Sequence, residues 1–578
     1  MEPTAFPRRV AAAAAALPCL ALVLLAVAGC GGARRSASTT APRTKATPQT
    51  KSPDSTRRAE AATAPAHEFP EFRIAMDGST DYLDPGLSDT TEGWGVMWNV
   101  YLPLLGYRHV SGPAGAQLVP YLATSLPHIS KDRRTYSLTL RKGLTYSNGE
   151  PVEASDFEKT VERDFLLDSA GAAFFRNVVG AERFAKRQKG GISGIVADNA
   201  ARTIVIHLEK PQGDFSNVLA SEFAAPVPAS SPPTDKSLHP LPATGPYMIT
   251  SYQPRSRIVE ARNPHFQAWR FHDRVPPGNP DRVTWDIVPS ASVALRRVLT
   301  GQDDWMGYYQ VPSKRLPQIE KTRKGRLRFF TPPNLMYFFM NTRVPPFTSL
   351  DVRRAVNYAI SRRWLKRLAG GLADTTENIL PPGYPSFRPH TLYRHNVRKA
   401  IRLVRKSGFE GKRVLVWNHD VPSDLPYTNY LVSVLRRIGF RAEEKVVTAG
   451  SYWSTLGDEK TRAQIGFADW VQDYPHPLDW FALLDGREIS STHNSNYANF
   501  DAGWANREIA ELTRRTRLTP AVNARWAALD REVMRQAPWA PFLNQKGTDF
   551  FSTRVDLGCY VNNVLYEFDY ASICVSKK

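Results

Sequence analysis

A short stretch at residues 467–484, FADWVQDYPHPLDWFALL, holds the side chains best suited to bind a small molecule. It combines three carboxylates with three large aromatic rings: Asp469, Asp473, Asp479, Trp470, Tyr474 and Trp480. Apolar rings beside a carboxylate suit a pocket for a small, partly apolar cation. A loop at the edge of the core, whose aromatic side chains only pack, is the alternative. Pro475 and Pro477 oppose a regular helix or central strand, which predicts a strand end that runs into a shaped loop.

Motifs of common enzymes are missing from the sequence. We find no Gly-x-Ser-x-Gly, His-Glu-x-x-His or Gly-rich phosphate-binding motif. A glycosidase that uses two carboxylates is still an alternative, because acids occur in pairs such as Asp469 with Asp473 and Asp303 with Asp304. His476 is the one candidate metal ligand, and an exposed loop histidine is the competing interpretation. The sequence therefore predicts no enzyme activity, no cofactor and no metal site.

Length and charge narrow the class of protein. The chain has 578 residues, too many for one core, and a formal net charge of +20. A basic chain can bind nucleic acid, but the Lys and Arg residues are scattered and form no recognition motif. We interpret the charge as a solvated surface next to anionic envelope polymers or lipid, with no nucleic-acid partner. After the N-terminus, no apolar run approaches the ~18 residues that span a bilayer.

The N-terminus resembles a bacterial lipoprotein signal. Arg8 and Arg9 precede an apolar run that ends in Val-Ala-Gly followed by Cys30. A charged start, an apolar run and small residues before a cleavage site are typical of a secretory signal, with an uncleaved helical anchor as the alternative. We expect residues 1–29 to be removed and Cys30 to carry a lipid at the extracytoplasmic face of the cell membrane. Residues 30–68 contain almost no large apolar side chain and are expected to form a disordered tether.

Two of the four cysteines remain once the signal and its lipidation site are set aside. They are Cys559 and Cys574, close to the C-terminus. In an exported protein, a spare pair of this kind is expected to form a disulfide.

The remaining patterns predict an α/β protein. Residues 334–341, NLMYFFMN, form an apolar run of the kind found in buried strands. After Ser349, a helix cap, apolar residues recur at helical spacing. A strand–helix–strand pattern over residues 413–417, 431–438 and 441–447 predicts a partly parallel sheet. Shorter patterns predict a strand at residues 72–76 and helices at residues 94–102 and 291–299.

A series of motifs follows in a fixed order along nearly the whole mature chain. They are Asp84-Pro85, TYSLTLRKGLTYSNGEPVEASDF from Thr135, Thr244-Gly245-Pro246-Tyr247, MYFFMNTRVPPFTSLDVRRAVNYAISR from Met336, and WVQDYPHP from Trp470. Each motif is weak by itself, but the ordered set resembles one family. It is the family of extracytoplasmic solute-binding proteins of peptide and nickel ABC transporters, also called the oligopeptide- and dipeptide-binding family or solute-binding protein family 5.

This resemblance implies a two-lobe, periplasmic-binding-protein-like α/β fold with a third domain inserted in the first lobe. The implied boundaries are residues 69–92, 235–335 and 545–578 for the first lobe, 93–234 for the inserted domain and 336–544 for the second lobe. The implied function is a lipid-anchored, monomeric binding protein of an ABC importer. It would capture oligopeptides between the closing lobes and deliver them to the permease subunits.

The resemblance also implies roles for individual residues. In peptide-binding members, an Asp shortly after a Trp in this loop pairs with the peptide's α-ammonium, and the matching residues here are Asp473 and Trp470. Backbone groups of residues 467–470 and 78–81 would pair with the peptide main chain as an added strand. The sequence departs from the family at Gln472, where a small residue is usual, and in its C-terminal cysteines. Further candidates for the cleft are Tyr82, Trp94, Tyr337, Tyr474 and Trp480.

Two alternatives keep the same fold. The ligand would be a different solute, such as a metal chelate, a sugar or an opine. Otherwise the protein would be a surface receptor that senses a peptide without import. Because both need the same cleft, the sequence does not choose between them and peptide import.

Overall fold

The structure is a computed structural model that describes residues 70–76, 80–266, 275–421, 424–492, 494–565 and 567–576. The predicted signal, the lipidation site at Cys30 and the predicted tether lie outside these residues, as does Gly78. Among the helices of the described residues, none is both long and apolar enough to cross a membrane.

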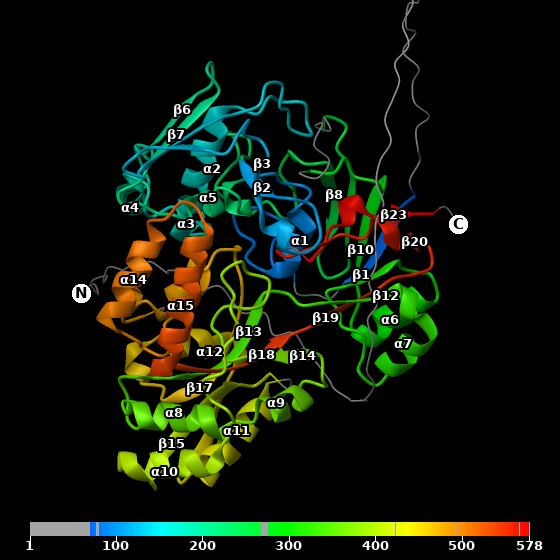
Figure 1. Ribbon diagram of the computed structural model, residues 1–578. Coiled ribbons are helices and arrows are strands. Elements are labelled where there is room, and N and C mark those ends of the chain that lie inside the picture. The colour runs from blue at the N-terminus through cyan, green and yellow to red at the C-terminus, as the bar shows by residue number, and fades with distance from the viewer. Residues whose placement is uncertain are drawn as a thin grey trace, which may run out of the picture.

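A five-stranded sheet, in the order β11-β1-β10-β9-β8, forms the centre of what we call lobe I (Figure 1). Its strands are β1 (Phe72–Met76), β8 (Tyr247–Gln253), β9 (Arg257–Arg262), β10 (Arg282–Ile287) and β11 (Trp305–Gly307). β1 runs parallel to both β10 and β11. Helices α6 (Ala291–Leu299) and α7 (Leu316–Arg323) share a small apolar cluster with this sheet.

A second, four-stranded sheet lies in residues 93–234, which we call the inserted domain. Its order is β4-β5-β7-β6, from β4 (His128–Ile129), β5 (Thr135–Thr139), β6 (Ile195–Asp198) and β7 (Thr203–His207), and helix α2 (Ala154–Leu166) packs nearby. One continuous core joins this domain to lobe I, since it contains both Ile74 of β1 and Phe157 of α2. Lobe I and the inserted domain therefore form one body.

A six-stranded sheet is the centre of lobe II, in the order β14-β18-β13-β17-β15-β16. Its strands are β13 (Asn334–Met340), β14 (Ala373–Thr375), β15 (Arg413–His419), β16 (Arg441–Val447), β17 (Ile465–Val471) and β18 (Trp539–Gln545). Helices α8 (Leu350–Ala359), α10 (Val397–Ser407) and α11 (Leu425–Arg437) cover one face, and α14 (Gly503–Thr513) and α15 (Pro520–Gln536) cover the other (Figure 1). β13 is buried throughout because Phe338 enters one core and Phe339 the other.

Two neighbouring strands carry the chain between the lobes. β13 follows β12 (Leu327–Phe330), and β18 precedes β19 (Gly547–Phe550). β13 and β18 pair in lobe II, while β12 and β19 pair on the lobe I side. The architecture is the two-lobe, periplasmic-binding-protein-like α/β fold, with a third domain inserted in the first lobe.

Most predicted elements are confirmed, and one helix is wrong. Helix α6 spans the predicted residues, and the Ser349 side chain accepts a hydrogen bond from the Val352 N–H at the start of α8. The helix predicted at residues 94–102 is instead α1 (Thr91–Met97). It ends early because the carbonyls of Asn99 and Val100 accept N–H groups of residues 244–247 rather than those of a further helical turn.

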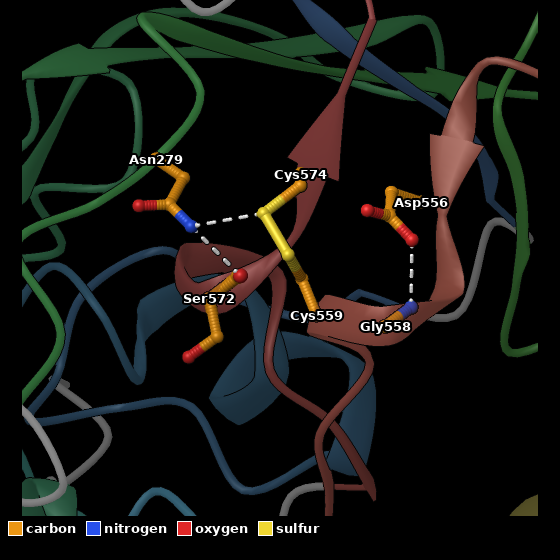
Figure 2. The surroundings of a disulfide bond; sticks show 6 residues. All are labelled: Asn279, Asp556, Gly558, Cys559, Ser572 and Cys574. Atoms are coloured by element: carbon orange, nitrogen blue, oxygen red, sulfur yellow. Dashed lines mark hydrogen bonds between the residues drawn. A yellow bond between two sulfur atoms is a disulfide. The ribbon is translucent and has the colours of Figure 1, made fainter.

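A disulfide joins Cys559 to Cys574 (Figure 2). The Asn279 side-chain amide donates to the Ser572 carbonyl over 2.9 Å and lies 3.6 Å from the sulfur of Cys574. The closed loop holds a small hairpin, β21 (Asn562–Asn563) and β22 (Glu567–Phe568). We call residues 559–574 the C-terminal loop.

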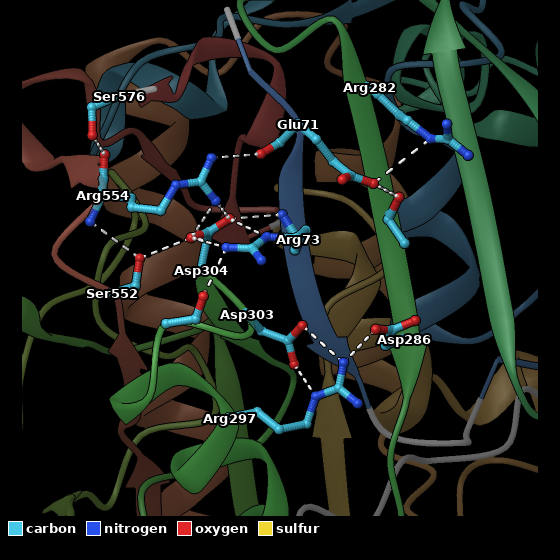
Figure 3. Close-up of polar contacts among 12 residues, drawn as sticks. Glu71, Arg73, Arg282, Asp286, Arg297, Asp303, Asp304, Ser552, Arg554 and Ser576 are labelled. Atoms are coloured by element: carbon cyan, nitrogen blue, oxygen red, sulfur yellow. Dashed lines mark hydrogen bonds and ion pairs between the residues drawn. The ribbon is translucent and has the colours of Figure 1, made fainter. Parts of the chain in front are cut away.

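Asp303 and Asp304 belong to an arginine-rich cluster in lobe I (Figure 3). Asp304 accepts hydrogen bonds from the Arg73 N–H over 3.1 Å and from Arg554 Nη1 over 2.8 Å. Asp303 pairs with Arg297. Because arginines already neutralise both buried carboxylates, this pair serves the fold, and the glycosidase alternative at these two residues is wrong.

Candidate functional site

The strand that leads into the candidate loop has one open edge. β17 pairs with β13 along its whole length, from Ile465 to Val471. On its other edge it pairs with β15 only at Ile465 and Gly466. Within the described part of the chain, no strand covers that edge from Phe467 onward. The predicted strand end is confirmed, and after it the chain forms a loop and the short helix α13 (Leu478–Phe481).

Asp479 orients the first residues of this loop. It is 5% exposed. Its Oδ2 accepts from the Trp470 indole N–H over 3.3 Å and lies 3.3 Å from the Asp473 backbone nitrogen. Asp479 thus fixes both the ring of Trp470 and the backbone of Asp473, and it leaves the Asp473 carboxylate to face elsewhere.

The Asp473 carboxyl faces a carboxyl from the opposite lobe. Burial, together with the charge of Asp89, raises the pKa of Asp473 to about 7. Burial raises the pKa of Asp89 to about 7 as well, helped by a hydrogen bond with Asp81 and the charge of Asp81. Among the described residues, no Lys, Arg or His forms an ion pair with Asp473 or Asp89. Two carboxyl groups, one from each body, are therefore close enough for the charge of Asp89 to act on Asp473, and neither has a cationic partner among the described residues.

Residues on either side of Asp473 contact the other body directly. The Gln472 side-chain amide donates to the Val564 carbonyl of the C-terminal loop over 2.8 Å. The Tyr474 hydroxyl donates to Asp214 Oδ2 of the inserted domain over 2.7 Å. The structure thus gives the predicted ligand contact Tyr474 a different partner.

Two other predicted cleft residues are corrected. Trp480 is 0% exposed and Tyr337 is 1% exposed. Trp480 donates its indole N–H to the Tyr384 hydroxyl over 2.9 Å, and Tyr337 stacks on Trp539 with ring centroids 3.9 Å apart. Both side chains belong to the core of lobe II and offer no surface to a ligand.

Of the lobe I candidates, Trp94 belongs to the core, and Tyr82 stays a prediction. Trp94 is buried, and its indole N–H donates to the Ser88 carbonyl over 2.7 Å. Tyr82 is exposed, and no contact within the described residues links it to the Asp473 loop. The Asp81 carboxylate accepts the Ser88 and Thr90 hydroxyls over 2.7 and 2.8 Å, and the pairing of its backbone with a peptide stays a prediction.

His476 is a buried histidine at the edge of the core rather than an exposed one. Its Nδ1 accepts the Leu478 N–H over 3.1 Å, and its ring lies edge-on to Trp526. Burial lowers the pKa of His476 to about 4, so the ring is neutral. In the described ranges, no group of three or more His, Cys, Asp or Glu residues has a geometry that could hold a metal ion.

Sequence reasoning missed three residues of this region: Asp89, Asp214 and Tyr384. Each becomes part of it through a contact with a residue far away in the chain. No local pattern marks them, so the sequence held no signal for them.

Comparisons with known proteins now place the chain. The family model "Bacterial extracellular solute-binding proteins, family 5 Middle" matches residues 117–491. The chain belongs to this family. Because members are binding proteins of ABC importers on the extracytoplasmic side, the protein is a solute-binding protein and not an enzyme.

Relatives agree with this assignment over most of the chain. Glutathione-binding protein GsiB of Escherichia coli O6:K15:H31 (strain 536 / UPEC) is 23% identical over 494 residues, which cover 82% of this chain and 88% of the relative. Oligopeptide-binding protein OppA of Bacillus subtilis (strain 168) is 23% identical over 452 residues, which cover 74% of this chain and 78% of the relative.

Solved structures share the fold. Clavulanic acid biosynthesis oligopeptide binding protein 2 superposes with a TM-score of 0.81 at 25% identity, over 89% of this chain and 97% of that chain. The murein tripeptide-binding protein MppA in its unliganded open form has a TM-score of 0.71 at 21% identity, over 89% of this chain and 98% of that chain.

Proposed function

We propose that this protein captures peptides between its lobes by their free N-terminal ammonium and delivers them to an ABC permease. The observation that carries the proposal is the Asp473 carboxyl, which has no cation partner among the described residues and lies just past an open strand edge. A buried carboxylate without a cation costs several kcal/mol. An ammonium group in the closed cleft removes that cost, so binding favours closure.

The open edge of β17 supports a peptide over other cations. An extended peptide pairs with an exposed strand edge through its main chain, which gives affinity without demanding particular side chains. On this edge the Phe467 carbonyl accepts the Tyr452 hydroxyl over 2.7 Å, and the strand then continues to Val471, two residues before Asp473, without a partner strand among the described residues. A peptide laid along this edge brings its N-terminus towards the Asp473 carboxyl.

Charge distribution supports a cationic ligand end. The chain as a whole carries +20, yet Asp473 and Asp89 face each other from opposite lobes. Two carboxyl groups whose charges interact attract a cation and disfavour an anion of similar size. The printed functions of several relatives, oligopeptide, dipeptide and murein tripeptide binding, agree with a peptide ligand.

The remaining parts of the proposal concern placement in the cell. Cys30 is lipidated, residues 30–68 tether the folded body to the membrane, and the protein acts as a monomer that docks on the permease. Lobe I (residues 69–92, 235–335 and 545–578) and the inserted domain (residues 93–234) move as one body against lobe II (residues 336–544). Mass spectrometry of the tryptic N-terminal fragment tests the anchor, since a mass of diacylated Cys30 is expected.

Native mass spectrometry tests the ligand class directly. The chain with Cys30 replaced by Ser is purified under mild conditions, and its ligands are released by unfolding. A ladder of short peptides is the expected result. A single defined non-peptide mass would keep the fold and replace the ligand. Calorimetry with Asp473→Ala then assigns the ammonium partner, with the exposed acid variant Asp501→Ala as the matched control.

A further inference from the structure

Three consecutive residues at the end of β17 engage three different segments of the opposite body. Gln472 donates to Val564 of the C-terminal loop, the charge of Asp89 of lobe I acts on Asp473, and Tyr474 donates to Asp214 of the inserted domain. Because lobe I and the inserted domain share one core, these contacts all hold the same body against lobe II. Asp473 is therefore flanked by two direct hydrogen bonds between the lobes.

Gln472 is held in place from within lobe II. Its Oε1 accepts the Tyr384 hydroxyl, and the Tyr384 oxygen accepts the Trp480 indole N–H over 2.9 Å. Gln472 is 7% exposed, so both ends of its amide need partners from the protein. The amide N–H reaches across to the Val564 carbonyl of the opposite body. Such a chain of hydrogen bonds strengthens each member in a buried setting.

The acceptor of Gln472 is anchored on its own side. The Val564 carbonyl lies in the hairpin of the C-terminal loop, whose base the Cys559–Cys574 disulfide closes (Figure 2). The Asn563 side chain donates to the Arg108 carbonyl of the inserted domain over 2.9 Å. Gln472 thus contacts the loop that the cysteine pair closes.

The inserted domain makes a second contact beside Asp214. The Gly213 N–H donates to the Thr513 carbonyl at the end of α14 over 2.6 Å, and Arg133 Nη1 donates to the Arg514 carbonyl over 2.9 Å. The last carbonyls of a helix lack partners within the helix, and here another domain supplies them. A Cβ at Gly213 would overlap the carbonyl oxygens of Thr513 and Arg515, so this contact requires glycine.

We propose that Gln472 and Tyr474 are positioning residues that clasp the lobes together on both sides of Asp473. They set the closed fraction, and hence affinity, without touching the ligand. The disulfide-closed C-terminal loop is the receiving surface for Gln472, and the Gly213 contact with α14 is the receiving surface beside Tyr474. The effect on affinity rests on the proposed function, because a clasp at this point retains a ligand only if that ligand binds Asp473.

Hydrogen–deuterium exchange at the Gly213 amide reads closure directly, because its acceptor belongs to lobe II. With no peptide added, Gln472→Ala is expected to speed this exchange about fivefold, the factor that corresponds to one hydrogen bond of about 1 kcal/mol. Tyr474→Phe is expected to act similarly. The exposed lobe I variant Gln318→Ala is the matched control. Wild-type exchange in both clasp variants would overturn the proposal.

Two further kinds of variant test the two contacts separately: a steric variant at Gly213 and a variant without the disulfide. Gly213→Ala is expected to open the lobes most, while Gly325→Ala, where a Cβ meets no atom within 4 Å, is the control. The Cys559→Ser, Cys574→Ser double variant should match Gln472→Ala and add nothing to it, because both act through the Val564 contact. Full additivity between them would contradict the clasp. Circular dichroism confirms that each variant is folded.

Tetra-alanine separates this inference from the proposed function. If the peptide slows Gly213 exchange in the wild type and dissociates about fivefold faster from Gln472→Ala, both hold. If it leaves the wild type unchanged while Gln472→Ala still exchanges faster, the clasp holds and this peptide is not a ligand. If it binds wild type and Gln472→Ala with equal rates of dissociation and exchange, the clasp is overturned and the peptide function stands.

Discussion

Two pairs of carboxyl groups in this protein lie in opposite circumstances. Asp303 and Asp304 are buried in lobe I, where Arg297, Arg73 and Arg554 neutralise them (Figure 3). Asp473 and Asp89 face each other across the lobes, and no ion pair among the described residues neutralises either of them. In the sequence, Asp473 and the pair Asp303 and Asp304 look equally suited to chemistry, whereas no local pattern marks Asp89. A carboxylate that the fold pairs with an arginine stabilises the protein, whereas a carboxylate without such a partner is available to a ligand.

The largest expected effect falls on the neutralised pair. Asp304→Ala removes the partner of Arg73 and Arg554 and leaves their charges half-buried. Loss of one member of a buried ion pair costs about 3–5 kcal/mol, so we expect a clear fall in the free energy of unfolding, measured by denaturant titration. Peptide affinity of the protein that stays folded should not change. An unaltered unfolding midpoint would contradict the structural role of Asp304.

For the pair Asp473 and Asp89, we expect a change to affect ligand affinity and not stability. Asp473→Ala is expected to weaken peptide binding by on the order of 2–5 kcal/mol in calorimetry, because the ligand's ammonium loses its counter-charge. Thermal unfolding of the ligand-free protein should stay the same or rise, since a carboxyl that is costly to bury has gone. A large loss of stability with unchanged affinity would make Asp473 a structural acid.

The pH dependence follows from the raised pKa values of about 7 at Asp473 and Asp89. The closed, ligand-free form holds these protons more tightly than the unfolded chain, where Asp titrates near 3.9. Its stability should therefore fall as the pH rises from about 4 to about 7. Affinity for tetra-alanine should rise over the upper part of that range, as the carboxylates form. Asp473→Asn should flatten the rise, and a wild-type affinity independent of pH would contradict this assignment.

The smallest effect is expected at the exposed rim of the lobe I cluster. Arg257 pairs with Asp286 over 2.6 Å, but the Arg257 side chain is half exposed, and Arg297 also pairs with Asp286. Exposed ion pairs contribute about 0–1 kcal/mol. Arg257→Ala should therefore shift the unfolding midpoint only slightly. A shift of the unfolding midpoint as large as that of Asp304→Ala would show that the difference in burial does not explain the difference in stability between the two ion pairs.

Local sequence patterns predicted those elements whose extent depends on their own residues. The apolar run at residues 334–341 is strand β13, because a strand buried on both faces needs apolar side chains on both. The end of α1 escaped prediction, because its limit is set by residues 244–247, which take up the carbonyls of Asn99 and Val100. A local helix pattern does not show that a distant segment, here residues 244–247, will bind the carbonyls that a longer helix would use.

The site shows the same division. The family resemblance pointed to Asp473, and the structure gives that residue an open strand edge and a facing carboxyl. Trp480, an aromatic neighbour in the same stretch, proved to be core, since residue type alone does not distinguish a ring that packs from a ring that binds. Asp214 joined the region only through the approach of the inserted domain to lobe II, which no local pattern encodes.

Lobe I is assembled from segments that precede and follow lobe II in the sequence, and this sets the order in which the two lobes can be completed during synthesis. β1 is synthesised before lobe II, yet the buried Asp304 cluster that holds it needs Arg554, which is synthesised after lobe II. The sheet of lobe II comes entirely from residues 334–545. Domains fold as units during synthesis, so lobe II can fold before the segment that completes lobe I has been made.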